Sequence, residues 1–157
     1  MEIVLLSINK TKNKNLINLI EDYEKRINHY VKFSSVCSNE IKSLKKLSEE
    51  EQKNKEALWI QKNIKKGDLF VLLDESGTSH SSKEFAKFLA NKYNSNHKKL
   101  IFIIGGPFGF AKSIYSLKAE KISLSKMTFT HQMSRLFFCE QLYRANTILK
   151  NGNYHHK

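Results

Sequence analysis

The pattern of residues 100–109, LIFIIGGPFG, predicts a buried strand that runs directly into a glycine-rich loop. Leu100–Ile104 are apolar without alternation, as expected for a strand that helices cover on both faces. Leu69–Leu73 form a second run of the same kind, and between the two runs Ser81–Glu84 has the spacing of a capping box that opens a helix. Strand, helix and strand in this order predict an α/β fold with a mostly parallel sheet flanked by helices.

The segments on either side extend this pattern. We predict further strands at residues 2–8 and 32–37, and a short segment at residues 121–124 precedes the last helix. Helices are expected where apolar residues recur at spacings of three and four, or where a capping box precedes them. They are a helix carrying Leu16, Leu19, Ile20, Tyr23, Ile27 and Tyr30, one that begins at Ser48, a short one through Leu117, and a long one from about Thr130 to Lys150.

Length and composition indicate one domain covering residues 1–157. The chain is 40% hydrophobic, which is enough for a core without disulfides or structural metals. Cys37 and Cys139 lack the spacing of a zinc or redox site, so we expect two reduced packing residues and no metal. The apolar start of the chain is too short for a signal peptide, and no segment is long enough to cross a membrane. We therefore expect a cytoplasmic protein.

The charge favours a polyanionic partner. The sequence has 27 Lys and Arg against 15 Asp and Glu, a net charge of +12. RNA, DNA or an anionic membrane surface would each suit this charge. The alternative explanation of the charge is that the Lys- and Asn-rich composition reflects the host proteome, without a polyanionic partner.

Three segments carry candidate chemistry. The Gly105–Gly109 loop follows a strand, where ligands bind in open α/β sheets, yet it is neither the dinucleotide fingerprint nor a P-loop. A tight turn would explain it equally well. Residues 73–77, LDESG, are predicted to end the preceding strand in a turn, in which Asp74 is more simply a turn residue than a catalytic carboxylate. Residues 123–133 combine hydroxyls, a lysine and His131, although Thr128 or Thr130 could only cap a helix and His131 could be a surface residue.

Basic and aromatic residues gather toward the end of the chain. Arg135, Arg144 and Lys150 lie on the predicted last helix, and the chain closes with Tyr154-His155-His156-Lys157. This combination suits stacking on unpaired bases and contact with phosphates. The alternative for the last residues is a frayed terminus.

These motifs together resemble a known family over nearly the whole chain. The chain resembles the small SPOUT-class methyltransferases that modify N3 of a pseudouridine in large-subunit ribosomal RNA, the RlmH family. The resemblance rests on six elements. They are Leu73-Asp74-x-x-Gly77, Ile104-Gly105-Gly106-x-x-Gly109, Ser123-Leu124-Ser125-x-Met127-Thr128-Phe129, His131-Gln132-x-x-Arg135, Glu140-Gln141-Leu142-Tyr143-Arg144-Ala145 and Tyr154-His155. Thr130 departs from the pattern, since many relatives have proline there, and His156 is a second tail histidine.

The resemblance implies a SPOUT-type fold whose C-terminal part, about residues 69–157, binds the cofactor and is tied in a deep trefoil knot. It also implies a homodimer with the donor pocket beside the subunit interface. The methyl donor would be S-adenosylmethionine, which carries no phosphate and needs no P-loop lysine. Carried onto this sequence, donor binding falls on Leu73, Gly105, Leu124, Ser125, Lys126, Met127, Thr128 and Phe129.

The implied reaction needs a group that removes the N3 proton. We expect His131 and His155 as candidates for that role, with Tyr154 orienting the base and Arg135, Arg144 and Lys157 holding phosphates of ribosomal RNA. The ribosome would be the partner. Two rivals are a non-catalytic basic RNA-binding module and a nucleotide-dependent oxidoreductase. The second lacks the glycine fingerprint and the acidic ribose partner.

Overall fold

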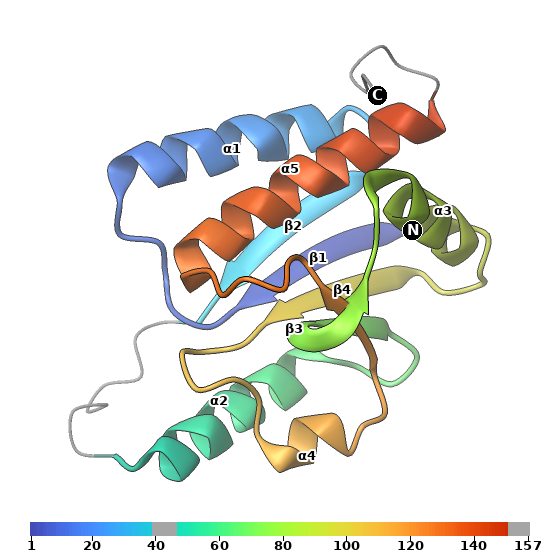
Figure 1. Cartoon of the computed structure of the whole chain (residues 1–157). Coiled ribbons are helices and arrows are strands. Elements are labelled where there is room, and N and C mark those ends of the chain that lie inside the picture. Colours follow the sequence, from blue (N-terminus) through green and yellow to red (C-terminus); the bar gives the residue numbers. More distant parts are fainter. Residues whose placement is uncertain (39–46, 151–157) are drawn as a thin grey trace.

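The computed structural model describes residues 1–38 and 47–150 and contains one five-stranded sheet (Figure 1). All neighbouring strands are parallel, which confirms the predicted sheet. From one edge to the other, the strands are β2 (Lys32–Cys37), β1 (Glu2–Ser7), β4 (Lys99–Ile104), β3 (Leu69–Ser79) and β5 (Glu120–Ser123).

Helices cover both faces of the sheet (Figure 1). One face carries α1 (Lys14–Asn28), α3 (Ser82–Tyr93) and α5 (His131–Leu149), with α5 packed against both of the others. The opposite face carries α2 (Glu49–Asn63) and the short α4 (Lys112–Tyr115), which contact each other. Because parallel strands point the same way, the segments that follow β1, β3, β4 and β5 meet at the carboxyl edge of the sheet.

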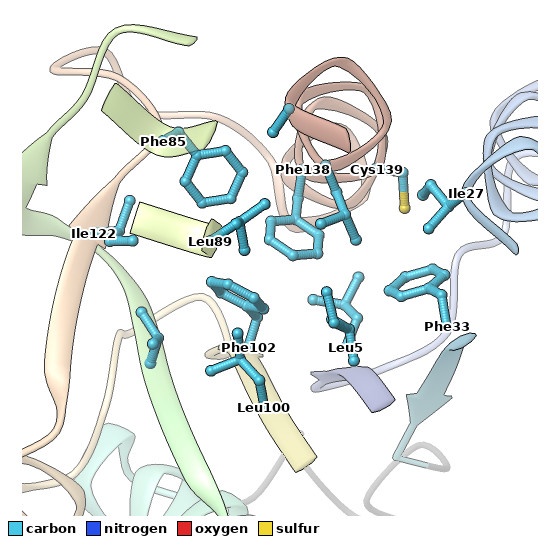
Figure 2. Close-up of a cluster of buried hydrophobic side chains, with 14 of the residues drawn as sticks. Leu5, Ile27, Phe33, Phe85, Leu89, Leu100, Phe102, Ile122, Phe138 and Cys139 are labelled. Carbon is cyan, nitrogen blue, oxygen red and sulfur yellow. The ribbon is translucent and has the colours of Figure 1, made fainter. Parts of the chain in front are cut away.

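The central strands contribute to two hydrophobic clusters, which explains their unbroken apolar runs. Leu100, Phe102 and Ile104 of β4 pack beneath α1, α3 and α5, whereas Ile101 and Ile103 pack beneath α2 and α4. In the first cluster the rings of Phe102 and Phe138 lie 4.7 Å apart between centroids (Figure 2). Each such side chain contributes roughly 1.5–3 kcal/mol by leaving water, so the sheet is fixed on both faces.

Side-chain caps fix where the helices begin. The Ser48 and Ser81 hydroxyls each accept a hydrogen bond from the backbone N–H three residues later. The side chains of Glu51 and Glu84 in turn accept from the backbone N–H groups of Ser48 and Ser81. Both predicted capping boxes are therefore confirmed. The Thr130 hydroxyl accepts from the Met133 N–H, so the helix cap that we considered for Thr130 is also present.

The prediction that β3 ends in a turn at residues 73–77 is wrong. The strand continues to Ser79, but its pairing with β5 slips, because Leu73 and Thr78 both lie opposite Ile122. Residues 74–77 therefore bulge out of the ladder at the carboxyl edge. A Cβ on Gly77 would lie 2.6 Å from backbone atoms of Ile122, so the glycine permits a close approach of two strands rather than a turn.

The cysteines behave as predicted. Both are free thiols, Cys139 is buried in the core, and burial raises the pKa of its thiol. Within residues 1–38 and 47–150, no helix is long and apolar enough to cross a membrane.

Candidate functional site

The β3 bulge and the segments that follow β4 and β5 line one cavity at the carboxyl edge of the sheet. Its volume is about 610 Å³, within the usual range for small-molecule sites. Of the residues predicted to bind a donor, all but Lys126 line this cavity. They are Leu73, Gly105, Leu124, Ser125, Met127, Thr128 and Phe129. Lys126 is exposed and is not among the lining residues.

The glycine loop rests on a buried carboxyl group that sequence reasoning missed. Glu56 of α2 is 2% exposed, and its carboxylate accepts hydrogen bonds from the Gly106 N–H and from Gln52 Nε2, the latter at 2.9 Å. Burial raises the pKa of Glu56, although both hydrogen bonds oppose this effect. A Cβ on Gly106 would lie 2.4 Å from the Glu56 carboxylate, so glycine is required for this contact. The loop is thus held from beneath by α2.

A second polar network joins the β3 bulge to α4. Asp74 accepts hydrogen bonds from the Ser76 N–H at 2.8 Å, the Ser76 hydroxyl at 2.6 Å and the Tyr115 hydroxyl at 2.5 Å. Lys121 donates to Ser76 at 3.1 Å. Burial raises the pKa of Asp74, but these hydrogen bonds and the Lys121 charge outweigh it, so the net pKa is lowered. Burial, with the bond to Asp74, raises the pKa of Tyr115 to about 12. Asp74 and Tyr115 form a fixed polar wall of the cavity.

His131 is the titratable imidazole in the cavity wall. It is the first residue of α5, it is half-buried, and it lines the cavity. Burial and the charge of Arg135 lower its pKa below the ordinary 6.5. The imidazole is therefore neutral at pH 7 and able to accept a proton. Its place in the cavity wall distinguishes His131 from the surface residue that we considered as the alternative.

Arg135 does not occupy the place that we predicted. It is 3% exposed, and its guanidinium donates to the Thr11 hydroxyl and to the carbonyl oxygens of Ile8 and Asn9. A guanidinium that is buried and bonded within the fold cannot contact phosphate, so the predicted RNA contact at Arg135 is wrong. Its role is to fasten the segment after β1 to α5.

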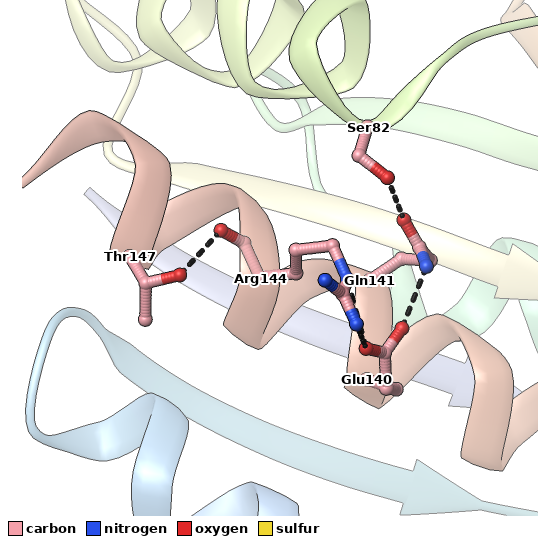
Figure 3. A network of polar contacts seen from close by, with 5 residues as sticks. All are labelled: Ser82, Glu140, Gln141, Arg144 and Thr147. Carbon is pink, nitrogen blue, oxygen red and sulfur yellow. Dashed lines mark hydrogen bonds and ion pairs between the residues drawn. The ribbon is translucent and has the colours of Figure 1, made fainter. Parts of the chain in front are cut away.

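Arg144 lies farther along α5 in a polar network (Figure 3). Its Nε and terminal nitrogen donate to Glu140 at 2.9 and 2.5 Å, and Gln141 links Glu140 to Ser82 of α3. Arg144 does not line the cavity, and its RNA contact stays a prediction. Tyr154, His155 and Lys157 lie outside the described residues.

Sequence reasoning also missed Tyr115 and Ser134, which line the cavity. Ser134 follows His131 by three residues on α5, so a helical projection would have placed His131 and Ser134 on one face of the helix. Glu56 gave no signal, because it is one of many charged residues in α2. Among residues 1–38 and 47–150, no group of His, Cys, Asp and Glu side chains could hold a metal ion.

Together, the parallel sheet and the cavity at its carboxyl edge, without a phosphate-binding fingerprint, define an α/β protein with a small-molecule site. A family model described as "Predicted SPOUT methyltransferase" matches residues 1–155. The chain belongs to the SPOUT methyltransferase family.

Full-length relatives refine this assignment. The chain is 52% identical over 157 residues to a protein of Flavobacterium psychrophilum and 51% identical to one of Phocaeicola vulgatus, covering all of both chains in each case. Both relatives are named ribosomal RNA large subunit methyltransferase H. The fold is also similar to a probable methylase family protein from Haemophilus influenzae, with a TM-score of 0.51 and 14% identity, covering 94% of this chain and 66% of that one.

Proposed function

We propose that this methyltransferase uses S-adenosylmethionine to methylate N3 of a pseudouridine in large-subunit ribosomal RNA, on the assembled ribosome in the cytoplasm. The observation that carries the proposal is the convergence of the β3 bulge and the loops after β4 and β5 on one cavity whose wall includes His131. The relatives named as large-subunit ribosomal RNA methyltransferases support the substrate class.

The cavity suits a sulfonium nucleoside. Leu73, Ile104 and Leu124 offer apolar walls to an adenine ring, and the Gly105–Gly109 loop adds backbone N–H and C=O groups to the same cavity lining. The described cavity lining contains no lysine or arginine, as expected for a donor without phosphates. When bound, S-adenosylmethionine supplies the electrophilic methyl group.

The protein's own contribution is positioning and proton removal. Bond formation to N3 releases the N3 proton, and the neutral His131 imidazole is placed in the cavity wall to accept it. Methyl transfer breaks the carbon–sulfur bond as the carbon–nitrogen bond forms, so the enzyme must hold the two reacting atoms in line. Tyr154 is a further candidate for orienting the base, and His155 for accepting the proton. Lys126 is proposed to bind the methyl donor, and Arg144 and Lys157 to contact phosphates of the RNA.

The chain is also proposed to form a single domain whose part from about residue 69 onward binds the cofactor and is knotted. The family model, which matches residues 1–155 as one unit, supports the single domain.

We include a homodimer in the proposal. Met127 and Phe108 at the cavity are 76% and 43% exposed, and Phe137 of α5 is 37% exposed beside Phe129. Phe108, Met127 and Phe129 line one cavity and Phe137 contacts Phe129, and exposed apolar side chains that gather in this way mark interaction surfaces. Light scattering coupled to size exclusion tests this part, with a monomer contradicting it.

Mass spectrometry of ribosomal RNA tests the reaction. Cells that lack this protein should lose one methyl group on a pseudouridine of the large-subunit RNA, and the wild-type gene should restore it, whereas His131→Ala should not. An unchanged methylation pattern would contradict the proposal. A non-catalytic RNA-binding module predicts that unchanged pattern, so the same experiment decides between the two.

A further inference from the structure

The segment that connects β1 to α1 concentrates positive charge at the carboxyl edge of the sheet. Residues 9–14 read NKTKNK, and Lys10, Lys12 and Lys14 are all exposed. The sequence has no acidic residue between Ile3 and Ile20, and α1 has none in its first turn. Because β1 is parallel to its neighbours, this segment follows the strand at the same edge as the cavity.

Side chains of α5 hold this segment in one conformation. The Gln132 side-chain oxygen accepts from the backbone N–H groups of Lys12 and Asn13 at 2.9 and 3.3 Å. Arg135 donates to the Thr11 hydroxyl at 2.7 Å and to the Ile8 carbonyl oxygen at 2.7 Å. The backbone that carries the three lysines is therefore fixed to the first two turns of α5.

The same two turns form part of the cavity wall. His131 and Ser134 line the cavity, and their immediate neighbours Gln132 and Arg135 hold the lysine segment. The position of the lysines is thus set relative to the cavity by a single rigid helix.

Holding the lysine segment in place requires burial of a charged group, which a segment that only kept the protein soluble would not need. Taking the Arg135 guanidinium out of water carries a desolvation penalty, which its hydrogen bonds to the segment offset. A lysine segment that is already ordered loses less conformational entropy when it binds an anion. The substrate of the proposed function is a polyanion whose charges recur at regular spacing.

We infer that Lys10, Lys12 and Lys14 bind the phosphates of the RNA strand beside the nucleotide that enters the cavity. The inference rests on the proposed function and extends it, because it names the RNA contact on the β1–α1 segment that replaces the contact first predicted for Arg135.

A matched pair of variants tests the inference. The first carries Lys10→Gln, Lys12→Gln and Lys14→Gln. The control carries Lys62→Gln, Lys65→Gln and Lys66→Gln, exposed residues at the end of α2 and before β3, at the opposite edge of the sheet. Both remove three positive charges. Affinity for large ribosomal subunits from cells lacking this protein is measured between 50 and 200 mM salt, together with methyl transfer and binding of S-adenosylmethionine.

Three phosphate contacts make the wild-type affinity fall about 20- to 40-fold further over this salt range than that of the β1–α1 variant. The control variant should follow the wild type in salt dependence, and both variants should retain the wild-type melting temperature and donor affinity. Equal salt dependence in the two variants would overturn the inference. Failure of the wild type itself to methylate the subunits would instead overturn the proposed function.

Discussion

Gly106→Ala tests whether the contact with Glu56 shapes the donor cavity. A Cβ at this position would lie 2.4, 2.5 and 2.7 Å from Oε1, Oε2 and Cδ of the Glu56 side chain, so the carboxylate must move. Overpacking of this kind costs about 1–3 kcal/mol. Loss of the Gly106 N–H bond to a charged acceptor adds about 1.5–3 kcal/mol. We therefore expect a loss of roughly 2.5–6 kcal/mol, or about 5–24 °C in Tm for a chain of this size.

A double-mutant cycle with Glu56→Ala isolates the cause. Removing the carboxylate makes room for the methyl group that Gly106→Ala adds, so the double variant should be more stable than the sum of the single effects by about 1–3 kcal/mol. Urea denaturation measures the free energies of unfolding. Additive effects would refute the proposed contact, because they would show that Gly106 is needed for another reason.

Three further predictions concern the cavity and α5. His131→Ala should lower the methylation rate at saturating donor, and a normal rate would exclude His131 as the proton acceptor. Because the pKa of His131 is lowered in the folded protein, the methylation rate of the wild type should decline with acidification only at pH values below 6.5. Tyr115→Phe removes one hydrogen bond to Asp74 and should cost about 1 kcal/mol at neutral pH. Because the pKa of Asp74 is lowered in the folded protein, the difference in free energy of unfolding between wild type and Tyr115→Phe should narrow as the pH falls below 3.8. Chemical denaturation at several pH values measures this difference, and a difference that stays constant would contradict the prediction. Arg144→Ala should flatten the salt dependence of RNA binding by about one unit of slope, and an unchanged slope would remove Arg144 from the interface.

Periodicity predicted most of the fold because it reflects burial. The unbroken apolar run at residues 100–104 is the direct consequence of a strand with a hydrophobic cluster on each face. The capping boxes at Ser48 and Ser81 were also readable, since they depend on residues three apart. The β3 bulge was not, because Gly77 is determined by the approach of β5, more than forty residues later in the chain.

The cavity could be predicted in outline, since the loops that follow parallel strands meet at one edge. The roles of charged residues could not. Arg135 has the sequence context of a surface residue on a basic helix, yet it is buried against Ile8 and Asn9, which are over 120 residues away. Glu56 likewise looks like any other acidic residue of α2, and its contact with Gly106 depends on how α2 packs beneath the sheet. Long-range burial decides both cases.

Calorimetric titration of the purified protein with S-adenosylmethionine measures whether the cavity at the carboxyl edge binds the methyl donor. If the β3 bulge and the segments after β4 and β5 form a donor site, the titration should show saturable heat with one donor bound per chain. S-adenosylhomocysteine should compete for the same site, and Gly106→Ala should weaken binding. A folded wild-type protein that gives no heat with either compound would contradict a donor site in this cavity.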